Sequence, residues 1–162
     1  MDTERMLLSY LQGIDEFINV LPEFPKKMWD YKPAPNRWSI KEIILHMADS
    51  EANSYVRCRK IIAENGSNVL IYDQDKWAEN LKYRDQNIET SLELFKQLRL
   101  NTYNLLLTIS DDKWDHYCMH PEQGRITLRD WLKIYTDHVH IHISQMRDNH
   151  DEWGKIKPAK KG

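Results

Sequence analysis

Apolar residues recur at intervals of three and four over four long stretches of the chain, which is the period of an α-helix with one buried face. Glycine (5) and proline (6) are scarce among the 162 residues, and runs of β-branched residues are few. We therefore predict an all-α fold, a four-helix bundle. The four predicted helices cover about residues 3–21, 39–64, 87–109 and 127–149.

Two of these helices begin with the same local signal. Ser39 is followed three residues later by Glu42, and Thr127 three residues later by Asp130. In such a capping box, each side chain bonds a backbone N–H at the other's end of the first turn. The signals predict where the second and fourth helices start.

The connections between the helices differ in length. Residues 65–84 form the longest one, in which 68–71 could be extended and 73–80 could be a short helix. A connection of this length allows the second and third helices to run in the same direction. Residues 114–125 are predicted to be a loop.

Length and composition limit the domain count and the partners. The chain is long enough for one domain with a core, which we place at 1–154, followed by a mobile basic tail, 155–162. The net charge of −2 argues against a nucleic-acid partner. No apolar run approaches the ~18 residues of a membrane span, and Met1–Arg5 leads into no apolar block of a signal peptide.

Two cysteines, Cys58 and Cys118, form no Cys-x-x-Cys motif. They are most simply the reduced thiols of a cytoplasmic protein. We therefore expect a cytoplasmic location and no role for either thiol as a nucleophile.

The strongest chemical signal is a pair of histidines in the last helix. His138 and His142 are four residues apart and fall within its apolar stripe, so that both imidazoles lie on one face. His140 points to the other side. The pair either bonds within a helical core or binds a metal ion, and a third ligand would favour the metal.

His46 is the best third ligand, because among the other histidines only it lies inside a helix near an apolar face. It lies seven residues past the cap of its helix, whereas His138 and His142 lie eleven and fifteen past theirs. Parallel helices would separate these depths by roughly 6 to 12 Å at a rise of ~1.5 Å per residue. A shared site therefore requires that the two helices be antiparallel, which gives an up-down-down-up bundle.

Three histidines without a carboxylate are typical of zinc or nickel with open coordination positions. The Glu-x-x-His motif of di-iron bundles is absent from the sequence. Asp49 and Asp137 could bond the outer nitrogens of the ligands, or be ordinary surface carboxylates.

Two arginines are candidates for substrate binding. Arg99 falls within the inward stripe of the third helix, where it either pairs with Glu51 or reaches an anionic ligand. Arg57, on the second helix, is the other candidate. Ser50 and Ser54 interrupt the inward stripe of that helix, so that they either leave room for a cavity or bond back to the preceding turn.

Three segments together resemble the DinB/YfiT-like superfamily: Trp38–Glu51, His120–Gly124 with Ile126–Leu128, and His138–His142 followed by Gln145. The resemblance implies an up-down-down-up bundle with a divalent metal on His46, His138 and His142. Many relatives have histidine or asparagine just before the last ligand, where this chain has Ile141. This departure changes the surroundings of the ligands but not the ligands.

The resemblance also implies two classes of function. Relatives include transferases and isomerases that use bacillithiol, mycothiol or glutathione, and proteins described as metal-dependent hydrolases. We therefore expect an enzyme that transfers a small-molecule thiol to an electrophile, or a hydrolase. The alternative is a non-catalytic bundle that binds a metal or another ligand, related to stress. A homodimer is expected in either case.

Overall fold

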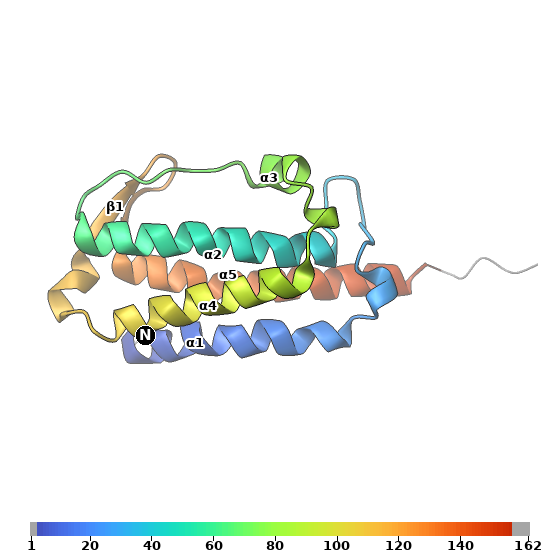
Figure 1. Ribbon diagram of the computed structural model, residues 1–162, viewed down its shortest axis with the longest axis horizontal. Helices are drawn as coiled ribbons and strands as arrows, with labels where there is room; N and C mark the ends of the chain where they lie inside the picture. The colour runs from blue at the N-terminus through green and yellow to red at the C-terminus, as the bar shows by residue number, and fades with distance from the viewer. Residues whose placement is uncertain (1–2, 157–162) are drawn as a thin grey trace, which may run out of the picture.

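The structure is a computed structural model, which describes residues 3–156. Part of the predicted basic tail, 157–162, lies outside the described residues. Four long helices form the body of the molecule (Figure 1). They are α1 (Thr3–Val20), α2 (Ile40–Ala63), α4 (Ile88–Leu106) and α5 (Leu128–Gly154).

The directions of the helices confirm the predicted topology. In Figure 1, α1 and α5 run from left to right, whereas α2 and α4 return from right to left. Around the bundle, α5 packs against α1 and α2, and α4 packs against the same two helices. The bundle is therefore up-down-down-up, with α2 and α5 as antiparallel neighbours, as a shared histidine site requires.

Both predicted capping boxes are present. The Ser39 hydroxyl accepts from the Glu42 N–H at 3.2 Å, and the Glu42 carboxylate accepts from the Ser39 N–H at 2.8 Å. Thr127 and Asp130 make the same exchange at the start of α5. The predicted end of α5 near residue 149 is wrong. Asn149 is buried inside the helix, where its amide donates to the Trp38 carbonyl, and α5 continues to Gly154.

The connections contain more structure than the sequence predicted. Helix α3 (Gln74–Asn80) confirms the short helix expected there. The predicted loop at 114–125 is instead largely a β-hairpin of β1 (Tyr117–His120) and β2 (Gly124–Thr127). Gly124 adopts a φ of 73°, which closes the turn, and Cys118 pairs with Ile126 with both side chains buried. Short 3₁₀ turns occupy Leu21–Glu23, Lys26–Met28, Tyr83–Asp85 and Asp111–Asp115.

The core is divided into two apolar clusters by a polar layer. One cluster gathers residues such as Phe17, Met47, Phe95 and Val139, and the other gathers residues such as Tyr10, Cys58, Leu106 and Trp131. On each long helix, one residue between the two clusters belongs to the polar layer. These residues are Gly13 on α1, Glu51 on α2, Arg99 on α4 and His138 on α5. The histidine site therefore lies at the level where the core is polar.

Arg99 is held by protein oxygens on all sides of its guanidinium. Its Nη1 donates to a Glu51 carboxylate oxygen at 2.9 Å, its Nε to the Tyr10 carbonyl at 2.7 Å, and its Nη2 to the Tyr135 carbonyl at 2.9 Å. A Cβ on Gly13 would lie 3.1 Å from Nη2, so the missing side chain makes room for the guanidinium. From α4, Arg99 thus bonds the three other long helices.

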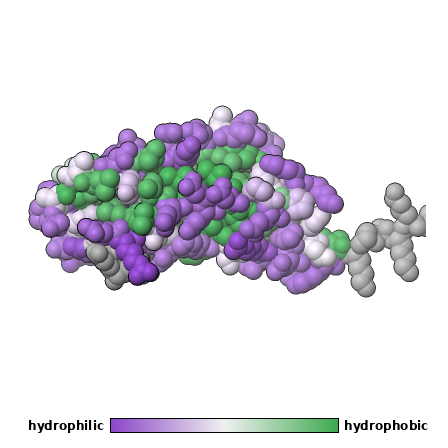
Figure 2. Space-filling view, turned by 90° about the horizontal axis from the view of Figure 1, so that it is seen from below, coloured by the Kyte–Doolittle hydropathy of each residue, from purple (hydrophilic) through white to green (hydrophobic). Residues whose placement is uncertain are grey.

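The outer surface mixes apolar and polar residues. Figure 2 shows the α1 side of the molecule, where apolar areas alternate with hydrophilic ones. Among the described residues, no helix combines the length and the apolar character that crossing a membrane would need.

Candidate metal centre

Three imidazoles converge between α2 and α5. The Nε2 atom of His138 lies 3.3 Å from Nε2 of His46 and 3.0 Å from Nε2 of His142. One ring nitrogen from each histidine can be chosen so that all three lie within 4.8 Å of one another. His46 and His142 are buried and His138 is half-buried. The antiparallel packing of α2 and α5 therefore brings together the three residues that the sequence singled out.

This cluster fits a divalent metal better than it fits hydrogen bonds. A single nitrogen, Nε2 of His138, is close to two others, and an N–H on it can donate to only one of them. In contrast, ligands about 2.0–2.1 Å from a tetrahedral ion lie about 3.3 Å apart. Two of the three separations, 3.0 and 3.3 Å, are close to that spacing.

Burial keeps the three rings neutral, as metal ligands must be. Burial, aided by the nearby His142, lowers the pKa of His46 to about 3, and burial lowers the pKa of His142 to about 4. Burial also lowers the pKa of His138 well below its ordinary value, and the two other rings add to this. At neutral pH each ring therefore offers a lone pair.

A neighbouring amide fixes which nitrogen of His142 carries that lone pair. Nδ1 of His142 lies 2.9 Å from Oε1 of Gln145, which only accepts hydrogen bonds. The proton is therefore on Nδ1, and Nε2 is free to bind a metal. Gln145 belongs to the motif quoted above, but its role was not predicted.

Packing orients the outer side of the His46 ring. Its Nδ1 atom is buried and has no partner among the described residues. The ring of Trp38 covers it, with centroids 4.6 Å apart, and stacks on His142 at 6.3 Å and 12°. Trp38 thus forms one wall of the site, held in turn by a bond from its Nε1 to Asp75.

Neither aspartate considered as a support for the ligands takes that role. Asp49 accepts from the Tyr83 hydroxyl, and Asp137 pairs with Lys133 on the surface. Asp137 precedes His138 by one residue and so lies on another face of α5, whereas the Asp49 carboxylate, one turn after His46, is bonded to Tyr83 instead.

A polar pocket of about 240 Å³ opens beside the triad. Its walls come from α2, the 65–73 connection, the β-hairpin and α5. Sequence reasoning set His120 aside as a loop residue, whereas the hairpin brings it next to His46 and His138. A turn with Gly124 between two short segments was the signal for that hairpin. The wall residues that sequence reasoning missed include Tyr72, His120, Glu122, Gln123 and Tyr135.

The two arginines have different surroundings. Arg57 lines the pocket, where Nη1 donates to the Tyr135 hydroxyl at 3.2 Å and Nη2 to the Leu70 carbonyl at 2.8 Å. Arg99 is fully buried and bonds Glu51. Of the two roles left open for Arg99, the geometry supports the ion pair.

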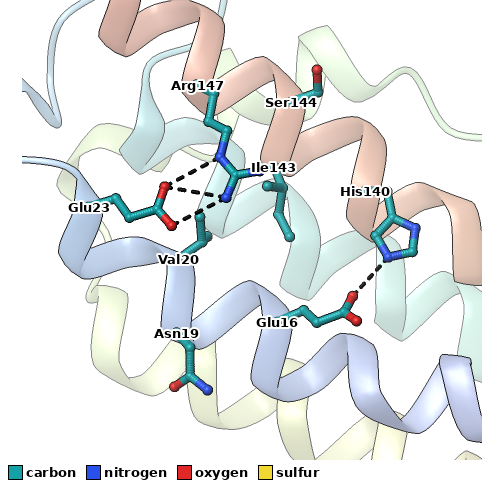
Figure 3. A pocket seen from close by; sticks show the side chains of 8 residues that line it. All are labelled: Glu16, Asn19, Val20, Glu23, His140, Ile143, Ser144 and Arg147. Carbon is teal, nitrogen blue, oxygen red and sulfur yellow. Dashed lines mark hydrogen bonds and ion pairs between the residues drawn. The ribbon is translucent and has the colours of Figure 1, made fainter.

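A second hollow lies on the other side of α5, between it and α1 (Figure 3). As predicted, His140 points away from the triad, and its Nε2 lies 2.8 Å from a Glu16 carboxylate oxygen. Arg147 pairs with Glu23 nearby. The ionisable groups of this hollow thus bond one another, from α5 to α1 and to the 3₁₀ turn that follows α1.

The chain is similar to curated proteins over most of its length. It is 28% identical over 144 residues to a candidate metal-dependent hydrolase of Oceanobacillus iheyensis, covering 82% of this chain and 83% of that protein. It is also 28% identical over 146 residues to YfiT of Bacillus subtilis, named as a candidate metal-dependent hydrolase, covering 83% and 82% of the two chains.

Solved structures share the fold. The structure of Bacillus subtilis YfiT, described as having an unusual four-helix bundle topology, matches with a TM-score of 0.86 at 23% identity, over 95% of this chain and 90% of that one. A mycothiol-dependent maleylpyruvate isomerase matches with a TM-score of 0.73 at 13% identity, over 90% of this chain and 61% of that one. The sequence model of the DinB superfamily matches residues 9–146. The chain therefore belongs to the DinB superfamily.

Proposed function

We propose that this protein is a metal-dependent enzyme that transfers a small-molecule thiol to an electrophile. The observation that carries the proposal is the convergence of three neutral imidazoles, two of which, those of His46 and His138, line an open, polar pocket. His46, His138 and His142 would hold the ion, for which zinc and nickel are the best candidates. When bound, the ion would supply Lewis-acid activation of a thiol or of water.

The chain's own residues position and protonate the reactants. Tyr135 keeps its proton, because burial raises its pKa to about 12, and its hydroxyl oxygen accepts from Arg57. The hydroxyl hydrogen of Tyr135 can therefore point into the pocket and donate to a substrate. Arg57 brings a positive charge to the same wall, suited to an anionic part of the substrate.

The thiol has to come from outside the protein. Burial raises the pKa of Cys58 to about 12 and also raises that of Cys118. Neither is a ready thiolate, so neither can serve as the nucleophile. The mycothiol dependence of an isomerase with the same fold, and the resemblance noted from the sequence, favour a small cellular thiol as the co-substrate.

Hydrolysis is the second candidate reaction. The names of the relatives at 28% identity favour it, and the same ligands would serve it. A non-catalytic metal-binding or ligand-binding bundle, related to stress, is the remaining alternative. A homodimer and a cytoplasmic location stay predictions under each of the three.

The first experiment measures the metal content of the purified protein. We expect about one equivalent of divalent metal, lost in His138→Ala and retained in the control His140→Ala, whose ring faces Glu16. Equal metal in the protein and in His138→Ala would contradict the site.

The second experiment incubates the metal-loaded protein with bacillithiol, mycothiol or glutathione and a generic electrophile. We expect conjugation with one of the thiols, abolished in His138→Ala. Ester hydrolysis without conjugation would favour a hydrolase. If neither reaction is found, the non-catalytic binding bundle is the remaining function.

A further inference from the structure

A smaller cavity of about 50 Å³ lies behind the pocket. This cavity and the pocket beside the triad are neighbours through a common wall, because both are lined by Arg57, His120, Gln123, Ile134 and Tyr135. Its other walls include Trp131 and the apolar residues Val69 and Ile126. Three of the residues that line this inner cavity bring an N–H group for which residues 3–156 offer no acceptor.

Arg57 brings a charge that has no counter-ion among the described residues. Its two Nη atoms donate to neutral oxygens, those of Tyr135 and Leu70, and its buried Nε has no partner in the part of the chain that the structure describes. Within residues 3–156 it forms no ion pair. Arg99, in contrast, is neutralised by Glu51. A partly buried cation without a partner is unfavourable, and a bound anion would remove that cost.

Trp131 brings a second donor. Its side chain is 1% exposed, and its Nε1 is buried without an acceptor among the described residues. Buried indole N–H groups usually find a partner, because leaving one unpaired costs about as much as a lost hydrogen bond. A ligand oxygen in the cavity would supply that acceptor.

His120 brings a third donor. Its Nδ1 accepts from the backbone N–H groups of Glu122 at 3.2 Å and Gln123 at 3.3 Å. The neutral ring therefore carries its hydrogen on Nε2, the side away from its own turn. His120 thus adds an N–H donor where the inner cavity meets the pocket.

We propose that the inner cavity is a subsite for a carboxylate group of the substrate, with Arg57 Nε, Trp131 Nε1 and His120 Nε2 as its donors. This inference rests on the proposed function, because it names the substrate class of the same site. A volume of about 50 Å³ is less than two water molecules occupy in the liquid, at about 30 Å³ each. Only a small end group fits, and the reacting part of the substrate would stay in the larger pocket. The carboxylate can belong to the thiol or to the electrophile.

The test follows the indole N–H signals of the six tryptophans by ¹H–¹⁵N NMR during a titration of the full, metal-free chain with acetate. Trp131→Phe assigns the Trp131 signal. We expect that signal alone to move in a saturable way with acetate, and not with the neutral analogue acetamide. Arg57→Gln should weaken acetate binding at least tenfold, whereas Arg59→Gln should not. The Arg59→Gln variant removes the same charge as Arg57→Gln. The native Arg59 side chain bonds Asn101 and Thr102 and does not line the cavity.

The outcomes separate this inference from the proposed function. Acetate binding in the metal-free chain supports the subsite even if no turnover is found. A Trp131 signal that does not move, that responds equally to acetamide, or that moves only after zinc is added overturns it. In a conjugation assay, acetate should compete with whichever co-substrate carries the carboxylate. Inhibition that is competitive with neither would also contradict the assignment.

Discussion

The ion pair of Arg99 and Glu51 allows a sharp test of whether Arg99 stabilises the fold or binds substrate. Arg99→Met would leave the Glu51 carboxylate, 1% exposed, with the Tyr10 hydroxyl as its one remaining side-chain partner among residues 3–156. It would also remove the donors to the carbonyls of Tyr10 and Tyr135. Removing one partner of a buried ion pair costs about 3–5 kcal/mol. Since domains are stable by about 5–15 kcal/mol, this is a large part of the total.

The assay is urea unfolding of the metal-free protein, followed by circular dichroism. Arg99→Met should lose about 3–5 kcal/mol, and the double variant Arg99→Met with Glu51→Gln should lose less, because no charge is then left unpaired. The control Arg84→Met breaks the exposed pair with Asp30, at 3.9 Å, and should cost less than about 1 kcal/mol. If Arg99→Met loses less than about 1 kcal/mol of unfolding free energy and its KM rises, the structural role is refuted and Arg99 is a substrate-binding residue.

Three further predictions concern the surroundings of the site. The metal-free protein should lose unfolding free energy as the pH falls from about 6.5 toward 4: the folded pKa values of His46 and His142 are lowered to about 3 and 4, so the unfolded chain binds more protons there. Urea midpoints at pH 7.5 and 5 would check this, and equal midpoints would contradict it. Gly13→Ala should lower the unfolding free energy by about 1–2 kcal/mol, because the added Cβ would lie 3.1 Å from Nη2 of Arg99. A higher melting temperature in this variant would contradict that. Gln145→Leu should weaken zinc affinity about 10–100-fold by releasing the Nδ1–H of His142, and an unchanged affinity in a chelator competition would show that Gln145 does not orient the ring.

Local sequence signals predicted the long helices well, because each depends on residues close together in the chain. The box of Ser39 and Glu42 placed the start of α2, and the apolar stripes placed the faces that are buried. The end of α5 was harder to predict, since Asn149 looked like a helix end and is instead bonded to the distant Trp38 carbonyl. The hairpin at 117–127 was missed because its strands are short and contain no long apolar alternation.

The sequence by itself identified the three histidines as candidate ligands and the helix directions that a shared site requires. The helical period fixes which side chains share a face, and the rise per residue fixes how far along the helix each one lies. Only the tertiary structure decided what surrounds them. Contacts between segments far apart in the chain place Trp38 against His46, bring His120 to the pocket, and surround Arg57 with neutral oxygens. Such contacts follow from the packing of helices and connections, which no local pattern encodes, and the electrostatics of a site follow from them.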